Sequence, residues 1–324
     1  MLSPRVRTFI LAVLIGGAFT HLAWSSAMAL LLSTRYPDRM VDVQRWPQSI
    51  SVQRVAEMVS LFLSNTINAS TAPNTVFVGS SVAYGFPWQA EVVVSARYAA
   101  LRPTEHVVNA SVVGSDLAFL ENAVLCGATN AGLRAEVVIV ELPVINSVLN
   151  IMRRSDEWVP ERCDETIGRV GYWSFAMRHP LGAGWLPYIW DDKAFAKADQ
   201  TVTVRQPYFG YFAGRKDFAR IEPQFRREVI AAVERAKTVG QHVYAFPSPV
   251  LLPAVKELGF EADSVHSQLT ATLDACRTVA GVECLDPELF YARRDAYFNM
   301  THFNQHGHQL LAEWLAQHIP ATHK

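Results

Sequence analysis

Short apolar segments alternate with segments of helical periodicity along most of this 324-residue chain. The expected strands span residues 75–78, 106–109, 136–143, 242–246 and 282–285. The expected helices span residues 51–62, 90–101, 117–125, 223–239 and 265–280. Helices that alternate with buried strands indicate a parallel sheet with right-handed crossovers. The sequence therefore predicts an α/β fold, a flavodoxin-like three-layer sandwich around a five-stranded parallel sheet.

The balance of charge excludes one class of partner. The chain carries 29 basic and 30 acidic residues, and half of its residues are hydrophobic. It has the apolar content for one large domain, but no basic surplus to neutralise phosphates. Nucleic acid is therefore not an expected partner.

The N-terminal region has the pattern of a membrane anchor. Residues 8–32 are uncharged and mostly apolar, long enough for a helix to cross a hydrocarbon core of ~30 Å. Arg5 and Arg7 precede this segment and favour a cytoplasmic N-terminus, whereas Arg35 and Arg39 follow it and weaken that argument. We expect residues 1–35 to be an N-terminal transmembrane helix with its flanks.

A cleaved signal peptide is the alternative, because Ala27-Met28-Ala29 has the small-x-small pattern of a cleavage site. The apolar run continues through residues 30–32, which favours the anchor. Either interpretation exports the rest of the chain, with residues 36–72 as a linker and lead-in helix. The expected location is the inner (cytoplasmic) membrane, single-pass, with the catalytic domain on the periplasmic or extracellular side.

The first expected strand stops abruptly at Gly79-Ser80-Ser81. Ligands of open α/β sheets bind beyond the carboxyl ends of the strands, so a serine in this turn is well placed for chemistry. We expect Gly79 to permit a tight turn and Ser81 to point outward. The alternative is an ordinary turn or helix cap, so the serine needs a base elsewhere in the chain.

That base is expected near the C-terminus, where His302 is followed by Asn304 and Gly307. Together the two segments resemble the SGNH (GDSL-like) hydrolase superfamily. In that family a Gly-x-Ser turn after the first strand carries the nucleophile, and a late Asp-x-x-His carries the base. The resemblance covers residues 76–315, within an expected SGNH-like domain of residues 73–324, and implies a serine esterase or acyltransferase without a cofactor. One position departs from the family, because Asn299 stands where the family has Asp.

The resemblance also implies donors for an oxyanion. Gly114 follows the second expected strand and matches the glycine whose backbone N–H serves this role in the family. Asn146 is the nearest candidate for the asparagine beyond the third strand, although the family's Gly-x-Asn-Asp is missing. The alternatives are a turn glycine and an ordinary loop asparagine.

Asn299 leaves three interpretations open. An amide accepts a hydrogen bond from an imidazole but carries no charge to stabilise the imidazolium. The site can work as a Ser81–His302 dyad with Asn299 or a carbonyl group orienting the ring, Asp295 or Asp286 can replace the acid, or the site can be degenerate. We favour the dyad, because the segments that carry Ser81, Gly114 and His302 are all present.

The remaining histidines and the cysteines indicate no metal site. His306 and His308 lie near His302, but the start of the last helix is expected among them, so the three side chains need not converge. The cysteine spacing does not suggest zinc. Cys276 with Cys284 and Cys126 with Cys163 can form two disulfides, and four free thiols are an equal alternative.

Residues 150–222 break the alternating pattern. Four tryptophans are scattered there among prolines, glycines and charges, without periodicity. A long irregular insertion of this kind is typical of a functional segment, so we expect a cap over the carboxyl edge of the sheet. Alternatively, the tryptophans only pack the insertion onto the domain.

The predicted function is acyl-ester hydrolysis or transfer outside the cytoplasm. Membrane-anchored members of the resembled family act on cell-envelope polysaccharides, some as O-acetyltransferases beside a polytopic membrane protein. The resemblance thus implies an acylated carbohydrate or lipid substrate, a glycan hydroxyl as acceptor and a polytopic acyl-transfer partner. The alternatives are a non-catalytic glycan-binding or scaffold protein, favoured by Asn299, and a lipase acting at the membrane surface.

Overall fold

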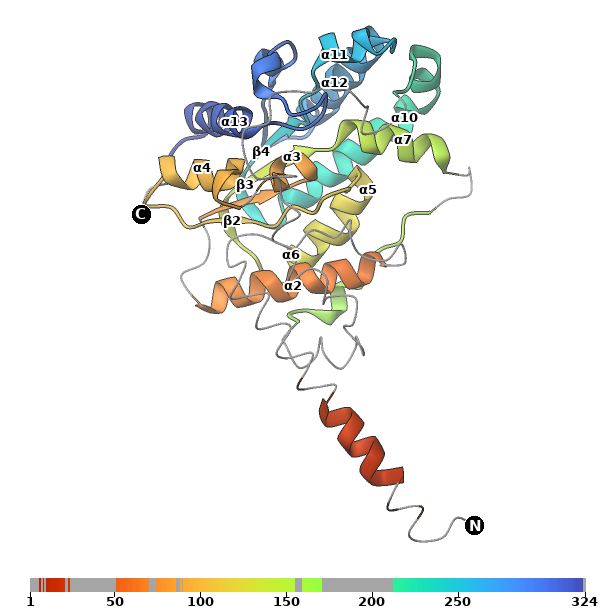
Figure 1. Cartoon of the computed structure of the whole chain (residues 1–324), viewed down its shortest axis with the longest axis vertical. Coiled ribbons are helices and arrows are strands. Elements are labelled where there is room, and N and C mark those ends of the chain that lie inside the picture. The colour runs from red at the N-terminus through yellow and green to blue at the C-terminus, as the bar shows by residue number, and fades with distance from the viewer. Residues whose placement is uncertain are drawn as a thin grey trace.

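The computed structural model of the chain is shown in Figure 1. It describes residues 51–69, 74–85, 88, 90–154, 159–170 and 212–322, together with residues 6, 8, 10–20 and 23 near the N-terminus.

A five-stranded parallel sheet forms the centre of the domain. Its strands are β1 (Thr75–Val78), β2 (Val107–Asn109), β3 (Ala135–Leu142), β4 (Gly240–Pro247) and β5 (Val282–Cys284). They lie in the order β2-β1-β3-β4-β5, and every pair is parallel. This is the flavodoxin-like order, in which the chain reverses its direction of winding between β1 and β3. The predicted α/β fold with a parallel sheet is confirmed.

Helices cover both faces of the sheet (Figure 1). On one face α4 (Val94–Leu101) contacts α13 (Gln305–His318). On the other, α10 (Arg215–Ala236) contacts α12 (Ala262–Arg277), α7 (Val144–Arg153) and a π-helical segment (Leu120–Leu125). That segment continues α5 (Leu117–Phe119) and leads into α6 (Cys126–Asn130). Beyond it lies α2 (Val52–Ala69), and the short helices α3 (Ser81–Tyr84) and α11 (Leu252–Glu257) follow β1 and β4.

Helix α10 begins at Arg215, not at Pro223 as the sequence predicts. A proline lacks the N–H that a helix interior needs, which is why the pattern suggests a helix start there. Phe218, Ile221 and Phe225 are nevertheless buried on one side of α10, and the rings of Phe218 and Phe225 lie 5.6 Å apart. Burial of these side chains outweighs the single missing hydrogen bond, so the helix continues through the proline.

The expected irregular insertion at residues 150–222 is shorter than predicted, because α7 and α10 occupy its two ends. Residues 155–158 and 171–211 lie outside the described residues. The described part, 159–170, joins α6 through the Cys126–Cys163 disulfide, and Asp164 N–H donates to the Gln53 side chain on α2. Since α6 ends just before β3 begins, these residues lie at the amino edge of the sheet. For residues 159–170, the predicted cap over the carboxyl edge is wrong.

Both cysteine pairs that the sequence suggests are disulfides. Cys126 bonds to Cys163, and Cys276 at the end of α12 bonds to Cys284 in β5. The alternative of four free thiols is therefore wrong.

The N-terminal region is described only in part. Residues 10–20 are helical, and residues 24–50, which include the end of the expected membrane span, lie outside the described residues. Among the residues that the structure describes, no helix has the length and apolarity that crossing a membrane requires.

Candidate active site

The structure brings Ser81 and His302 together at the carboxyl edge of the sheet. Ser81 is the first residue of α3, directly beyond β1, and its side chain is partly exposed. Its Oγ lies 2.9 Å from Nε2 of His302, which is 2% exposed. A hydroxyl and an imidazole at this distance can exchange a proton.

Asn299 contacts the imidazole of His302. Its Oδ1 accepts hydrogen bonds from the backbone N–H groups of Thr301 at 3.0 Å and His302 at 2.9 Å. Because these groups can only donate, the atom must be the amide oxygen and not the nitrogen. The same Oδ1 lies 3.1 Å from Nδ1 of His302. This favours the tautomer with a proton on Nδ1 and a lone pair on Nε2, which can accept the hydroxyl hydrogen of Ser81.

Burial lowers the pKa of His302 to about 4, because an imidazolium loses its hydration inside the protein. The neutral amide of Asn299 brings no charge to offset this cost. At neutral pH the ring is therefore an uncharged base.

The two aspartates considered as replacements for the acid have other partners. Asp295 lies 3.3 Å from Nε2 of His306 and pairs with Arg293, and Asp286 accepts from the Tyr291 hydroxyl at 3.2 Å. At the acid's place, Nδ1 of His302 is contacted by Asn299 Oδ1 at 3.1 Å and by the Thr301 hydroxyl at 3.2 Å.

The depressed pKa of His302 makes stability depend on pH. In the unfolded chain the ring titrates near ~6.5, so between that pH and about 4 the unfolded state binds a proton that the folded state does not. Stability should fall by about 3 kcal/mol as the pH falls through this range. The difference in the free energy of unfolding between pH 7 and pH 4.5, measured with urea, should be smaller in His302→Gln than in the parent. The control variant His306→Gln, which changes an exposed histidine, should show the same difference between the two pH values as the parent. Equal differences in the two variants would contradict the assignment of this pH dependence to His302.

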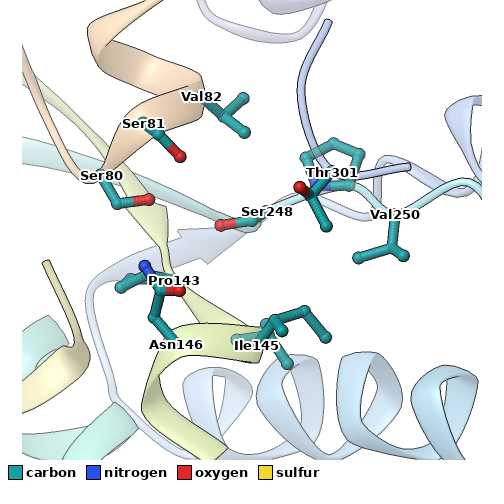
Figure 2. A pocket seen from close by; sticks show the side chains of 11 residues that line it. Ser80, Ser81, Val82, Pro143, Ile145, Asn146, Ser248, Val250 and Thr301 are labelled. Atoms are coloured by element: carbon teal, nitrogen blue, oxygen red, sulfur yellow. The ribbon is translucent and has the colours of Figure 1, made fainter. Parts of the chain in front are cut away.

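The two expected oxyanion donors lie in different surroundings. Ser81 and Asn146 both line a small pocket at the carboxyl ends of β1, β3 and β4 (Figure 2). The Asn146 amide donates to the Ser115 carbonyl at 3.2 Å. Gly114 is exposed, has a φ of 82°, and is not among the residues that line this pocket. The geometry therefore places Asn146, and not Gly114, in the pocket with the serine.

The residues that follow His302 build its loop and the start of α13. Asn304 is the N-cap of that helix: its Oδ1 accepts from Gly307 N–H at 2.8 Å, and its Nδ2 donates to the Asp295 carbonyl at 2.7 Å. Trp88, fully buried, donates from Nε1 to the Phe303 carbonyl at 2.7 Å and so ties the chain after α3 to this loop.

No group of three His, Cys, Asp or Glu side chains suited to a metal ion occurs among the described residues. His306 is exposed on α13 whereas His308 is fully buried. The three histidines of this segment therefore do not converge.

Sequence reasoning missed Glu141, the next-to-last residue of β3. This residue is fully buried, and its carboxyl group accepts hydrogen bonds from the turn that carries Ser81. One signal was present in the sequence, because a charged residue at the end of an otherwise apolar strand must find partners when it is buried.

Gly79 has a different role from the one predicted. It is not among the glycines with positive φ, so the turn does not require a glycine for its backbone conformation. A Cβ at this position would lie 2.7 Å from both Cβ and Oε2 of Glu141. The glycine is needed because β3 brings Glu141 so close.

The strand order, the serine beyond β1 and the histidine before the last helix agree with the resemblance to SGNH hydrolases, and at the level of the fold that prediction is confirmed. No protein-family model and no curated protein matches the sequence. Solved structures with a similar fold include three hydrolases, each with a low TM-score.

A lipolytic protein of the G-D-S-L family from Veillonella parvula has 11% identity and a TM-score of 0.42, over 75% of this chain and 96% of that chain. LAE5, an α/β hydrolase from the metagenome of Lake Arreo, has 14% identity and a TM-score of 0.40, over 75% and 94%. A catalytic mutant of Axe2, an acetylxylan esterase from Geobacillus stearothermophilus, has 11% identity and a TM-score of 0.37, over 75% and 92%. At these values the likeness concerns the fold alone and carries nothing about function.

Proposed function

We propose that this protein is a serine-dependent acyl-ester hydrolase or O-acyltransferase. The observation that carries the proposal is the 2.9 Å contact between Ser81 Oγ and His302 Nε2, where Ser81 also lines a pocket at the carboxyl edge of the sheet. A serine hydroxyl is a poor nucleophile until a neighbouring base removes its proton. His302, uncharged at neutral pH and oriented by Asn299, is such a base.

The reaction follows from this geometry in two halves. Ser81 Oγ attacks the ester carbonyl while His302 Nε2 takes the hydroxyl proton, and the imidazolium then returns that proton to the leaving alcohol. This leaves an acyl group on Ser81. Water or a second alcohol then gives its proton to His302 and attacks the acyl group, and the imidazolium returns that proton to Ser81 Oγ as the acyl bond to the serine breaks. Asn146 in the pocket and the Ser81 backbone N–H are the proposed donors to the oxyanion.

The proposal extends to location and substrate. The apolar run at residues 8–32 supports a single-pass anchor in the inner membrane with the domain on the periplasmic or extracellular side. An anchored enzyme of this kind would act on an acyl ester of a cell-envelope glycan, with a glycan hydroxyl as acceptor when it transfers. A polytopic membrane protein that supplies acyl groups is the proposed partner. A non-catalytic binding or scaffold role is the alternative, supported by the missing charge at Asn299.

A fluorophosphonate probe tests the activated serine directly. The full-length chain in detergent should label covalently, Ser81→Ala should not label at all, and His302→Ala should label about 10²–10⁴-fold more slowly because the base is lost. Ser267→Ala and His306→Ala, which change a partly exposed serine and an exposed histidine, should label like the parent. A folded parent that does not label would reject the enzyme and favour the binding role.

A further inference from the structure

Glu141 is a buried titratable group that the Ser81–His302 chemistry does not use. Its Oε2 accepts from the backbone N–H groups of Ser80 at 2.7 Å and Ala83 at 2.9 Å. Its Oε1 accepts from the Ser80 hydroxyl at 2.7 Å and from the Ser248 hydroxyl, which comes from the end of β4. One carboxyl group thus connects β3, the nucleophile turn and the residue after β4.

These hydrogen bonds surround the nucleophile. Ser80 precedes Ser81 and Ala83 follows it by two residues, so Oε2 of Glu141 holds the backbone on both sides of the serine. The side chain of Ser80, the N-cap of α3, makes no capping bond to its own helix; its hydroxyl donates to Glu141, and the N–H of Ala83 donates to Glu141 as well. Glu141 therefore supplies the acceptor that an N-cap side chain ordinarily gives to the N–H of Ala83.

Two further contacts fix the same turn. The Asn109 side chain at the end of β2, on the other side of β1 from β3, donates from Nδ2 to the Ala83 carbonyl at 2.7 Å. Gly79 leaves room for Glu141, since a Cβ there would lie 2.7 Å from its Oε2. In Figure 2, Ser80 and Ser248 point toward each other at one side of the pocket that Ser81 lines.

We propose that Glu141 is the positioning residue of Ser81. By accepting from both flanking N–H groups it fixes the backbone of the turn, and so keeps Ser81 Oγ at 2.9 Å from His302 Nε2. This inference rests on the proposed function. Small displacements of a reacting group slow a reaction strongly, by about 10²-fold for ~1 Å, so loss of these bonds should appear in the rate of acylation.

The test compares three substitutions of Glu141 by the rate of fluorophosphonate labelling of the full chain. Glu141→Leu removes every acceptor and should label about 10²-fold more slowly. Glu141→Gln should label within about 10-fold of the parent, because its oxygen can face the two N–H groups while its NH₂ donates to the two hydroxyls. Glu141→Asp is one methylene shorter, cannot reach all four donors, and serves if the leucine variant does not fold.

Glu105 gives a matched control. It is also a buried glutamate, 8% exposed, and its Oε2 accepts from the Thr75 hydroxyl at 2.8 Å, at the opposite end of β1 from Ser81. Glu105→Leu should unfold at lower urea concentration, but its folded fraction should label at the parent's rate. A role of Glu141 in stability alone would give the same result for Glu141→Leu.

The pH dependence and amide exchange complete the test. Glu141 acts through Ser81 and not through the imidazole. The pH at which the labelling rate falls to half on the acid side of the pH profile should therefore be the same in Glu141→Leu as in the parent. Folded leucine and aspartate variants that label like the parent would overturn the proposal, as would a glutamine variant as slow as leucine. If the parent does not label, the proposed function fails, and amide exchange at Ser80 and Ala83 then decides whether Glu141 holds the turn.

Discussion

Asn299→Asp should increase the rate of fluorophosphonate labelling at neutral pH by about 10²-fold. The side chain keeps its shape, so a carboxylate oxygen can still accept from Thr301 N–H, His302 N–H and His302 Nδ1. It adds the negative charge that stabilises the imidazolium formed as Ser81 loses its proton. In serine hydrolases with an aspartate in this role, the reverse change to asparagine costs about 10⁴ in kcat.

The same substitution should move the acid limb of the pH profile. A carboxylate beside the ring favours its protonated form, so the pKa of His302 should rise from about 4 towards its ordinary value. The reactive form is the uncharged ring, and labelling should therefore begin to fall at a higher pH in the variant. Gln305→Glu adds the same charge to a partly exposed residue outside this contact and should leave the limb nearly unchanged. If Asn299→Asp changed neither the labelling rate at neutral pH nor the pH at which labelling falls, the role assigned to Asn299 beside the imidazole would be contradicted.

Gly307→Ala should cost about 3 kcal/mol of folding free energy. A Cβ at this position would lie 2.0 Å from the Ala296 carbonyl oxygen and 2.7 Å from Cδ1 of Phe303. The carbonyl is backbone and already accepts from Asn304 N–H at 3.0 Å, so relief of the clash requires α13 to move away from the loop. Because that loop carries His302, the folded fraction should also label more slowly.

Urea unfolding measures this change, and Gly281→Ala is the matched control. Gly281 has a φ of 79°, and no atom lies within 4 Å of the position that a Cβ would take there. Alanine at this residue should therefore cost only about 1 kcal/mol, for its backbone conformation. Equal losses in both variants would show that close packing is not the reason for Gly307.

The sequence predicted the candidate site through residues close together in the chain. The strand that ends at Gly79 pointed to Ser81, and the segment from Asn299 to Gly307 pointed to His302. It did not predict what holds these segments in place. Glu141 lies 61 residues along the chain from Ser80, and Trp88 lies 215 residues from Phe303, so their hydrogen bonds have no local signature.

The two residues expected to bind an oxyanion, Gly114 and Asn146, also show how far the sequence alone could predict the site. The sequence showed a turn glycine after the second expected strand. Whether this glycine lines the pocket depends on the three-dimensional course of the turn that follows. The structure places Asn146 in the pocket because α7 starts directly beyond β3, although the expected motif around it is missing. The membrane anchor, the location and the acyl-transfer partner remain predictions from the sequence.

Local patterns were enough to predict the parallel α/β fold and to select Ser81 and His302, which the structure brings into contact, because strand and helix periodicity and short motifs are properties of neighbouring residues. The packing of the folded chain was needed to show that close contacts require Gly79 and Gly307, that α10 continues through Pro223, and that residues 159–170 lie at the amino edge of the sheet. Each of these depends on which distant side chains and carbonyl groups pack against the segment, and the spacing of residues along the chain does not carry that information.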